Sequence, residues 1–242
     1  MSAEELIALL QRLEEIERGA ESLYSKYLED IKDEEAASIL KHIRDEETRH
    51  AVLASEAISL LRHGPNYPKI RTLLDDFSQT TFCFLSTGIE GYMKANLAVL
   101  DYLINERGLH CIYLAVNKPC ASLEEIYRRE GIDVDAISFL GYSSVGPGDA
   151  DDIVVNLENL TKLSRAVMTQ AEKHAGEGFV YFDAVSTLYI FHPSNTVEKF
   201  IYSLISRLKA ISVGLVLVAV EEAVDLRVKA VLTGFSDVML EF

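Results

Sequence analysis

The chain has 242 residues, of which 49% are apolar, so it is long enough to bury a substantial core in one or two domains. Its formal net charge of −15 argues against a nucleic-acid-binding protein and against an acidic membrane surface as a partner, because both are bound mainly through Lys and Arg. The longest apolar run, near Ile211 to Val220, is too short to span a bilayer, and the N-terminus is acidic. The cysteines form no CxxC motif and predict reduced thiols. We therefore expect a cytoplasmic protein.

Two parts of the chain differ in hydrophobic period. Residues 1–63 have helical spacing, whereas residues 75–242 alternate short β-rich runs with helical ones. Between them the stretch HGPNYPK has one Gly and two Pro, which favour a helix end and a connector. The sequence predicts an all-α domain at 1–63, a linker at 64–74 and an α/β domain at 75–242.

The first part predicts a hairpin of two long helices. Ser2 and Glu5 have capping-box spacing at the start of a helix that runs to about Asp30. Asp33 is a good N-cap for a second helix that continues to about Arg62. A turn this short makes the two helices antiparallel neighbours.

Steps of four and three along each predicted helix define an apolar seam that polar residues interrupt. Glu17 interrupts the seam of the first helix, and Glu47 and His50 interrupt that of the second. Since Glu17 and Glu47 each lie fifteen residues from residue 32, we expect them to face one another across the hairpin. Glu46 points outward. Charge in a helix seam costs free energy unless it is paired or coordinated.

A metal site accounts for these three polar residues. A Glu on one helix and a Glu-x-x-His on the next supply half of a carboxylate-bridged two-metal site, because residues at i and i+3 share a helix face. Carboxylate and imidazole ligands suit iron or manganese. The alternative is a buried, hydrogen-bonded cluster in a metal-free dimerisation hairpin.

The stretches IERGAESLYSKYL and DEETRHAVL resemble the rubrerythrin and ferritin-like family. Helices of that family have a Glu, a Tyr seven residues later and a Glu-x-x-His about thirty residues on, and Glu17, Tyr24, Glu47 and His50 match this pattern. The resemblance covers about residues 3–62, one hairpin, whereas a complete family member has four helices. It implies that two hairpins of a homodimer complete a two-metal site.

The second part opens with a strand, a glycine-bearing turn and a helix, which is where a P-loop belongs. Residues 88–95 align with the phosphate-loop pattern G-x-x-G-x-G-K-[ST], and Gly88, Gly91 and Lys94 fit it. Met93 replaces the glycine that lets backbone approach phosphate, and Ala95 replaces the hydroxyl that would hold Mg²⁺. We expect no ATP hydrolysis here.

The rest of this part alternates strands and helices, which predicts a three-layer, mostly parallel sheet covered on both faces. The predicted strands are Phe82 to Ser86, Cys111 to Val116, Ala136 to Leu140, Phe179 to Asp183, Val213 to Val220 and Val238 to Phe242. The stretch SSVGPGDADD, Ser143 to Asp152, predicts an acidic loop.

In element order and lengths, residues 75–242 resemble the KaiC-like branch of the RecA ATPase superfamily. The resemblance gives Asp183, at the end of a buried strand, the Walker B position. In that family an acidic pair that activates the attacking water follows the second strand, but Asn117 and Lys118 occupy those positions here. The resemblance therefore implies a RecA-like fold without hydrolysis. An ordinary doubly wound domain, with Gly88 and Gly91 in a tight turn, is the alternative.

These observations predict a non-hydrolysing regulatory or scaffold protein that dimerises through its hairpin and binds iron, or manganese, at Glu17, Glu47 and His50. No residue is assigned a catalytic role. Two alternatives remain. One is a di-iron oxidoreductase, ferroxidase-like or peroxidase-like, with Tyr24 near its metals. The other is a protein that senses a nucleotide through Gly88, Gly91, Lys94 and Asp183 without hydrolysing it.

Overall fold

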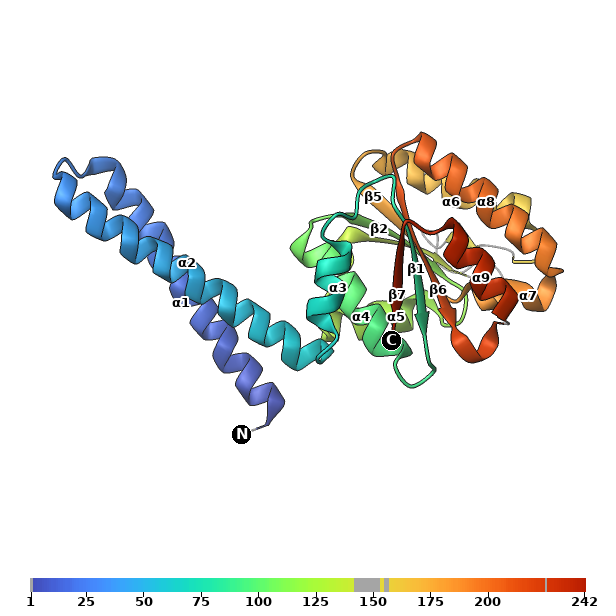
Figure 1. Ribbon diagram of the computed structural model, residues 1–242, viewed down its shortest axis with the longest axis horizontal. Helices are drawn as coiled ribbons and strands as arrows, with labels where there is room; N and C mark the ends of the chain where they lie inside the picture. The colour runs from blue at the N-terminus through green and yellow to red at the C-terminus, as the bar shows by residue number, and fades with distance from the viewer. Residues whose placement is uncertain (1, 142–152, 155–156, 225) are drawn as a thin grey trace. The chain divides into compact units, whose positions relative to one another are not determined.

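The structure is a computed structural model that describes residues 2–141, 153–154, 157–224 and 226–242. The chain forms two compact units, Met1–Pro68 and Lys69–Phe242 (Figure 1). The predicted acidic loop Ser143 to Asp152 lies outside the described residues. The segment 64–74, predicted as a linker, contains the helix α3, Tyr67–Leu74. In the described ranges no helix combines the length and the apolarity that crossing a lipid bilayer requires.

The first unit is the predicted helical pair, α1 (Ala3–Asp30) and α2 (Glu34–His63). The capping box is present, because Ser2 Oγ accepts from the Glu5 amide at 3.1 Å and Glu5 Oε2 accepts from the Ser2 amide at 2.7 Å. Asp33 caps α2 by accepting from the Ala36 amide at 2.8 Å. Gly64 ends α2 in the left-handed region, with φ 80°, and its amide bonds to the Leu60 carbonyl.

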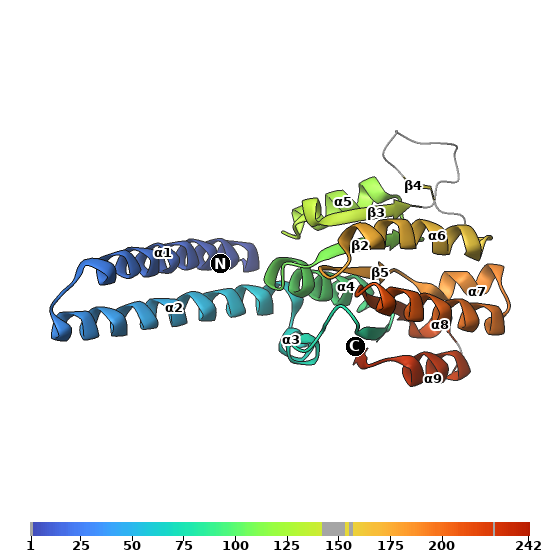
Figure 2. The ribbon, with the colours of Figure 1, turned by 90° about the horizontal axis from the view of Figure 1, so that it is seen from above.

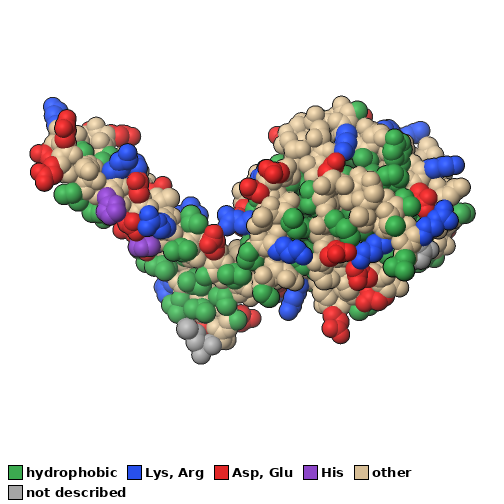
Figure 3. Space-filling view, in the orientation of Figure 1, with side chains coloured by type: hydrophobic (Ala, Val, Ile, Leu, Met, Phe, Trp, Pro, Cys, Tyr) green, Lys and Arg blue, Asp and Glu red, His purple; other side chains and the backbone are tan. Residues whose placement is uncertain are grey.

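The hairpin exposes an extensive apolar surface, and no residue of α1 is buried. Exposed apolar side chains run along both helices, and we call them the apolar face: Leu9, Leu13, Ile16, Leu23, Tyr27, Ile39, Leu53, Leu60 and Leu61. Most of them precede by one position a residue of the seam between the helices, as Ile16 precedes Glu17 and as Leu53 precedes Ala54, which is buried. One step back along the chain turns about 100° around a helix axis. In two antiparallel helices, this step leads from the sides that face each other to the same side of the hairpin. Figure 3 shows hydrophobic side chains gathered on the half of the hairpin that contains the N-terminus.

The second unit contains one parallel sheet in the order β4-β3-β2-β5-β6-β1-β7. The six predicted strands are present to within one residue at each end, and the sequence did not predict β4. The strands are β1 (Phe82–Thr87), β2 (His110–Ala115), β3 (Ile137–Gly141), β4 (Ile153–Val154), β5 (Gly178–Phe182), β6 (Gly214–Val220) and β7 (Val238–Glu241).

Helices cover both faces of this sheet, as Figures 1 and 2 show. The helices are α4 (Tyr92–Leu100), continued by a π-helical segment (Asp101–Glu106), α5 (Cys120–Arg129), α6 (Leu160–Ala171), α7 (Leu188–Phe191), α8 (Ser194–Ala210) and α9 (Leu226–Phe235). On one face, Tyr181 of β5 bonds to Asn96 of α4 at 2.7 Å, and Tyr113 of β2 accepts from Tyr127 of α5 at 2.7 Å. On the other face lie α6, α8 and α9. The predicted three-layer α/β architecture is confirmed.

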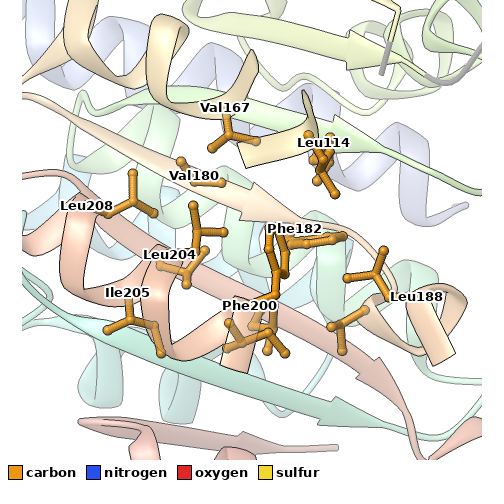
Figure 4. Packing of buried hydrophobic residues seen from close by; sticks show 14 of the residues in the cluster. Leu114, Val167, Val180, Phe182, Leu188, Phe200, Leu204, Ile205 and Leu208 are labelled. Atoms are coloured by element: carbon orange, nitrogen blue, oxygen red, sulfur yellow. The ribbon is translucent and has the colours of Figure 1, made fainter. Parts of the chain in front are cut away.

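The main core lies between the sheet and α6, α8 and α9. Phe182 of β5 packs with Leu204 and Phe200 of α8 in this cluster (Figure 4). Truncating a buried Phe to Ala typically costs about 3 to 5 kcal/mol. Because Phe182 directly precedes Asp183, this packing fixes the end of β5, where the candidate site begins.

Candidate functional site

The hairpin brings Glu17, Glu47 and His50 together. One potential ligand atom from each residue lies within 4.8 Å of the other two. His50 Nδ1 is 3.8 Å from Glu17 Oε1 and 3.8 Å from Glu47 Oε2. The cause is local, because residues at i and i+3 share a helix face and the tight turn places position 17 opposite position 47. Glu46 instead pairs with Arg49 at 2.9 Å.

The electrostatics of this cluster favour a cation. A hydrogen bond with Glu47 raises the pKa of Glu17, with burial and the charge of Glu47 adding to the effect and His50 opposing it. Two carboxylates this close disfavour double ionisation unless positive charge lies between them. Oxygen and nitrogen donors of this kind fit iron or manganese.

The cluster is open on one side. The side chains of Glu17 and Glu47 are 14% and 22% exposed, whereas that of His50 is 51% exposed. His50 precedes Ala51 of the hairpin interior and lies three positions before Leu53 of the apolar face. Tyr24, predicted to lie near the metals, is half-buried two turns beyond Glu17.

The turn after β1 contains Gly88 and Gly91, and the amides of Gly88, Ile89 and Gly91 bond within the chain. The Gly88 amide bonds to the Phe242 carbonyl at 3.2 Å, and the Gly91 amide bonds to the Gly88 carbonyl at 3.1 Å. The Ile89 amide points to Glu222 Oε1 at 3.4 Å. A phosphate loop needs such amides free to surround an anion. In this turn the amides of Gly88, Ile89 and Gly91 are engaged in hydrogen bonds within the chain.

Asp183 follows β5 and is 2% exposed. Burial raises the pKa of Asp183 to about 7. The Tyr92 hydroxyl, from the first residue of α4, donates a hydrogen bond to Asp183 Oδ1. Ala184, the next residue, has φ 58°, a left-handed conformation that is strained for a residue with a Cβ. The carboxyl group that the sequence predicts at a Walker B position is thus bonded to a tyrosine hydroxyl.

The other expected nucleotide residues are placed differently. Lys94 is exposed in the first turn of α4 and makes no hydrogen bond or ion pair within the described part of the chain. Asn117, after β2, accepts from Thr187 Oγ1 at 2.8 Å, and Lys118 is exposed. The structure therefore brings the Gly88 turn and Asp183 together through Tyr92, and it leaves Lys94 in solvent.

Sequence reasoning missed two residues of this site, Tyr92 and Glu222. Tyr92 occupies a position that the phosphate-loop pattern leaves unrestricted, so no motif identifies it. Glu222 lies beyond β6, 131 positions after Gly91, and only sheet order places it against the turn. Its neighbour Glu221 is bound by Lys229 at 2.7 Å and by Ser86 at 3.0 Å.

Neither a scan against protein-family models nor a search of curated proteins found a match to the chain. Solved structures do match. The flagellar accessory protein FlaH from Methanocaldococcus jannaschii matches with a TM-score of 0.51 and 10% identity, over 72% of this chain and 76% of its own. A KaiC-like protein from the archaeon Pyrococcus horikoshii matches with a TM-score of 0.48 and 10% identity, over 63% of this chain and 68% of its own.

The likeness to FlaH, at 10% identity, concerns the fold alone. The α/β unit has the RecA-like architecture that the order of its elements predicted. The resemblance of the hairpin to ferritin-like proteins stays a prediction, as do its metal and its role in dimerisation.

Proposed function

We propose that this chain is a non-hydrolysing regulatory or scaffold protein, which dimerises through its hairpin and holds iron, or manganese, between the two copies. The observation that carries the proposal is the cluster of Glu17, Glu47 and His50 on a hairpin with an apolar face. The RecA-like unit is the part that would engage a client or regulate it.

Dimerisation is supported by the exposed apolar surface of the hairpin. Ile16 is 67% exposed, and the remaining members of the apolar face follow heptad-like spacing along both helices. Apolar stripes with this spacing pack against other helices and are costly to leave in water. A second hairpin offers the matching surface, because a twofold axis pairs a face with itself.

Metal binding is supported by the donor set. Glu17, Glu47 and His50 would hold the ion, and a second copy would double this set, which gives the ligand count of a carboxylate-bridged pair of ions. Bound iron would supply one-electron chemistry with dioxygen or peroxide. The chain's own contribution is to place two carboxylates and an imidazole on facing helices.

The absence of hydrolysis is supported by the strand ends of the RecA-like unit. Met93 and Ala95 replace the glycine and hydroxyl of the phosphate loop, and no carboxylate occupies position 117 or 118. Asp183 is engaged by Tyr92. A water-activating base and a free Mg²⁺ ligand are both needed for ATP hydrolysis.

The test is elemental analysis of protein purified without chelator or affinity metal, together with the oligomeric mass. We expect a dimer with about one iron or manganese per chain. A metal-free dimer would contradict the metal and retain the assembly role. A metal-free monomer would contradict both. A loaded dimer that consumes peroxide catalytically would instead support the di-iron oxidoreductase.

A further inference from the structure

We propose that Tyr92 and Glu222 form an internal cap, which fills the cation and anion positions of the RecA-like site with the chain's own side chains. With the cap in place, both positions are filled by protein side chains without any bound nucleotide. This inference deepens the proposed loss of hydrolysis and rests on it. It is independent of the hairpin and its metal.

Glu222 occupies the anion position. Its Oε1 is 3.4 Å from the amide nitrogen of Ile89 and 3.5 Å from the point where a Cβ on Gly88 would lie. A carboxylate at a glycine-rich turn is held by the same N–H donors that surround a phosphate in a nucleotide site. A nucleotide phosphate would have to displace this carboxylate and would meet its charge.

Tyr92 occupies the cation position. In P-loop enzymes the Walker B Asp holds Mg²⁺, and here the hydrogen-bond donor on that carboxylate is the Tyr92 hydroxyl. The ring starts from the first residue of α4 and ends at the carboxyl end of β5, so it spans the distance between the turn and Asp183. A Mg²⁺ ion on Oδ1 of this carboxylate would have to displace the Tyr92 hydroxyl.

The contacts around the cap stabilise the closed turn. The Gly88 amide bonds to Phe242 O and the Gly91 amide to Gly88 O, so neither is available to a phosphate. A Cβ on Gly91 would lie 3.1 Å from Thr87 Oγ1, which shows how closely the turn is packed against the end of β1. Glu221, beside Glu222, is instead bound by Lys229 and Ser86, away from the turn amides.

The experiment measures binding of Mg²⁺·ATP by titration calorimetry to the full chain and to the double variant Tyr92→Ala, Glu222→Gln. Removing the ring and the charge should lower the Kd by at least about tenfold, because a like charge opposite a bound anion costs more than one tenfold step in affinity. Tyr92→Phe combined with Glu222→Gln removes the same charge but keeps the ring of residue 92 without its hydroxyl. It should gain less affinity than the Ala double variant.

Glu221→Gln is the matched control for general electrostatics, since it removes the same charge one residue away. The single variant Glu222→Gln is measured beside it, and the cap is overturned if Glu221→Gln gains as much affinity as Glu222→Gln. The cap is also overturned if the double variant has an unchanged circular dichroism spectrum and binds no tighter than the parent. Phosphate release is measured in parallel. Hydrolysis by the parent chain would contradict the proposed function, whereas failed binding by a folded double variant contradicts the cap alone.

Discussion

Tyr92 donates a hydrogen bond from its hydroxyl to Oδ1 of Asp183, a carboxyl group buried at the end of β5. The bond joins the first turn of α4, the helix after β1, to the end of β5, which lies two strands from β1 in the sheet. It gives the buried carboxylate a partner inside the protein. A buried carboxylate without such a donor would carry the full cost of desolvation.

Asp183 makes the stability of the protein depend on pH. Its pKa rises from 3.8 to about 7 on burial, so the folded protein binds this proton more tightly than the unfolded chain does. The free energy of unfolding contributed by this group is therefore greatest below pH 3.8 and is lost as pH rises to about 7. Asp183→Asn removes this loss. We expect the free energy of unfolding of the variant, relative to that of the parent, to increase by up to about 4 kcal/mol as the pH rises from 4 to 8.

Urea unfolding of both proteins at several pH values checks this prediction. Asp237→Asn is a control of opposite sign, because Lys209 and the Phe82 amide lower the pKa of Asp237 despite partial burial. That variant should lose stability relative to the parent at pH 8. A difference between Asp183→Asn and the parent that does not vary with pH would show that the carboxyl titrates normally.

Glu47→Gln should reduce the metal bound per chain at least about tenfold, because an amide replaces a charged ligand in a three-residue set. Glu46→Gln removes the same charge from a neighbouring position that pairs with Arg49, and it should retain the metal. Elemental analysis after identical purification measures both. Equal metal in the two variants would exclude Glu47 as a ligand.

Ile16→Glu should convert the dimer to a monomer. The substitution puts a charge in the middle of the apolar face, where a second hairpin would bury it, and an unpaired buried charge costs several kcal/mol. Leu226→Glu is the control, since Leu226 is equally apolar and 86% exposed on the RecA-like unit. Light scattering coupled to size-exclusion chromatography reports the mass. A dimer that survives Ile16→Glu would place the interface elsewhere.

Ala184→Gly should raise the free energy of unfolding by about 0.5 to 1 kcal/mol. A residue with a Cβ at φ 58° is strained by about 1 to 2 kcal/mol, and the extra entropy of Gly in the unfolded chain offsets part of the relief. Ala230→Gly, at an exposed position of α9, has the opposite expectation, a loss of about 1 kcal/mol. Urea midpoints at constant slope compare the two, and a destabilised Ala184→Gly would mean that the methyl group contributes packing greater than its strain.

Much of the architecture followed from local patterns in the sequence. The hairpin was predictable because Ser2, Glu5 and Asp33 satisfy helix-end amides by chemistry that acts within three residues. The juxtaposition of Glu17 and Glu47 also followed, because residues that lie equally far from a tight turn are opposite each other in the two helices. The six predicted strands were recognisable as continuous apolar runs buried on both faces.

The sequence by itself thus determined the two-part organisation, the α/β class and the grouping of Glu17, Glu47 and His50, since these depend on residue spacing within one element or across one turn. Only the tertiary structure decided what fills the strand-end site. Tyr92 meets Asp183, and Glu222 meets Ile89, across 91 and 133 positions of the chain. Contacts of that separation depend on the order of strands in the sheet, and no periodicity or motif in a single sequence encodes that order.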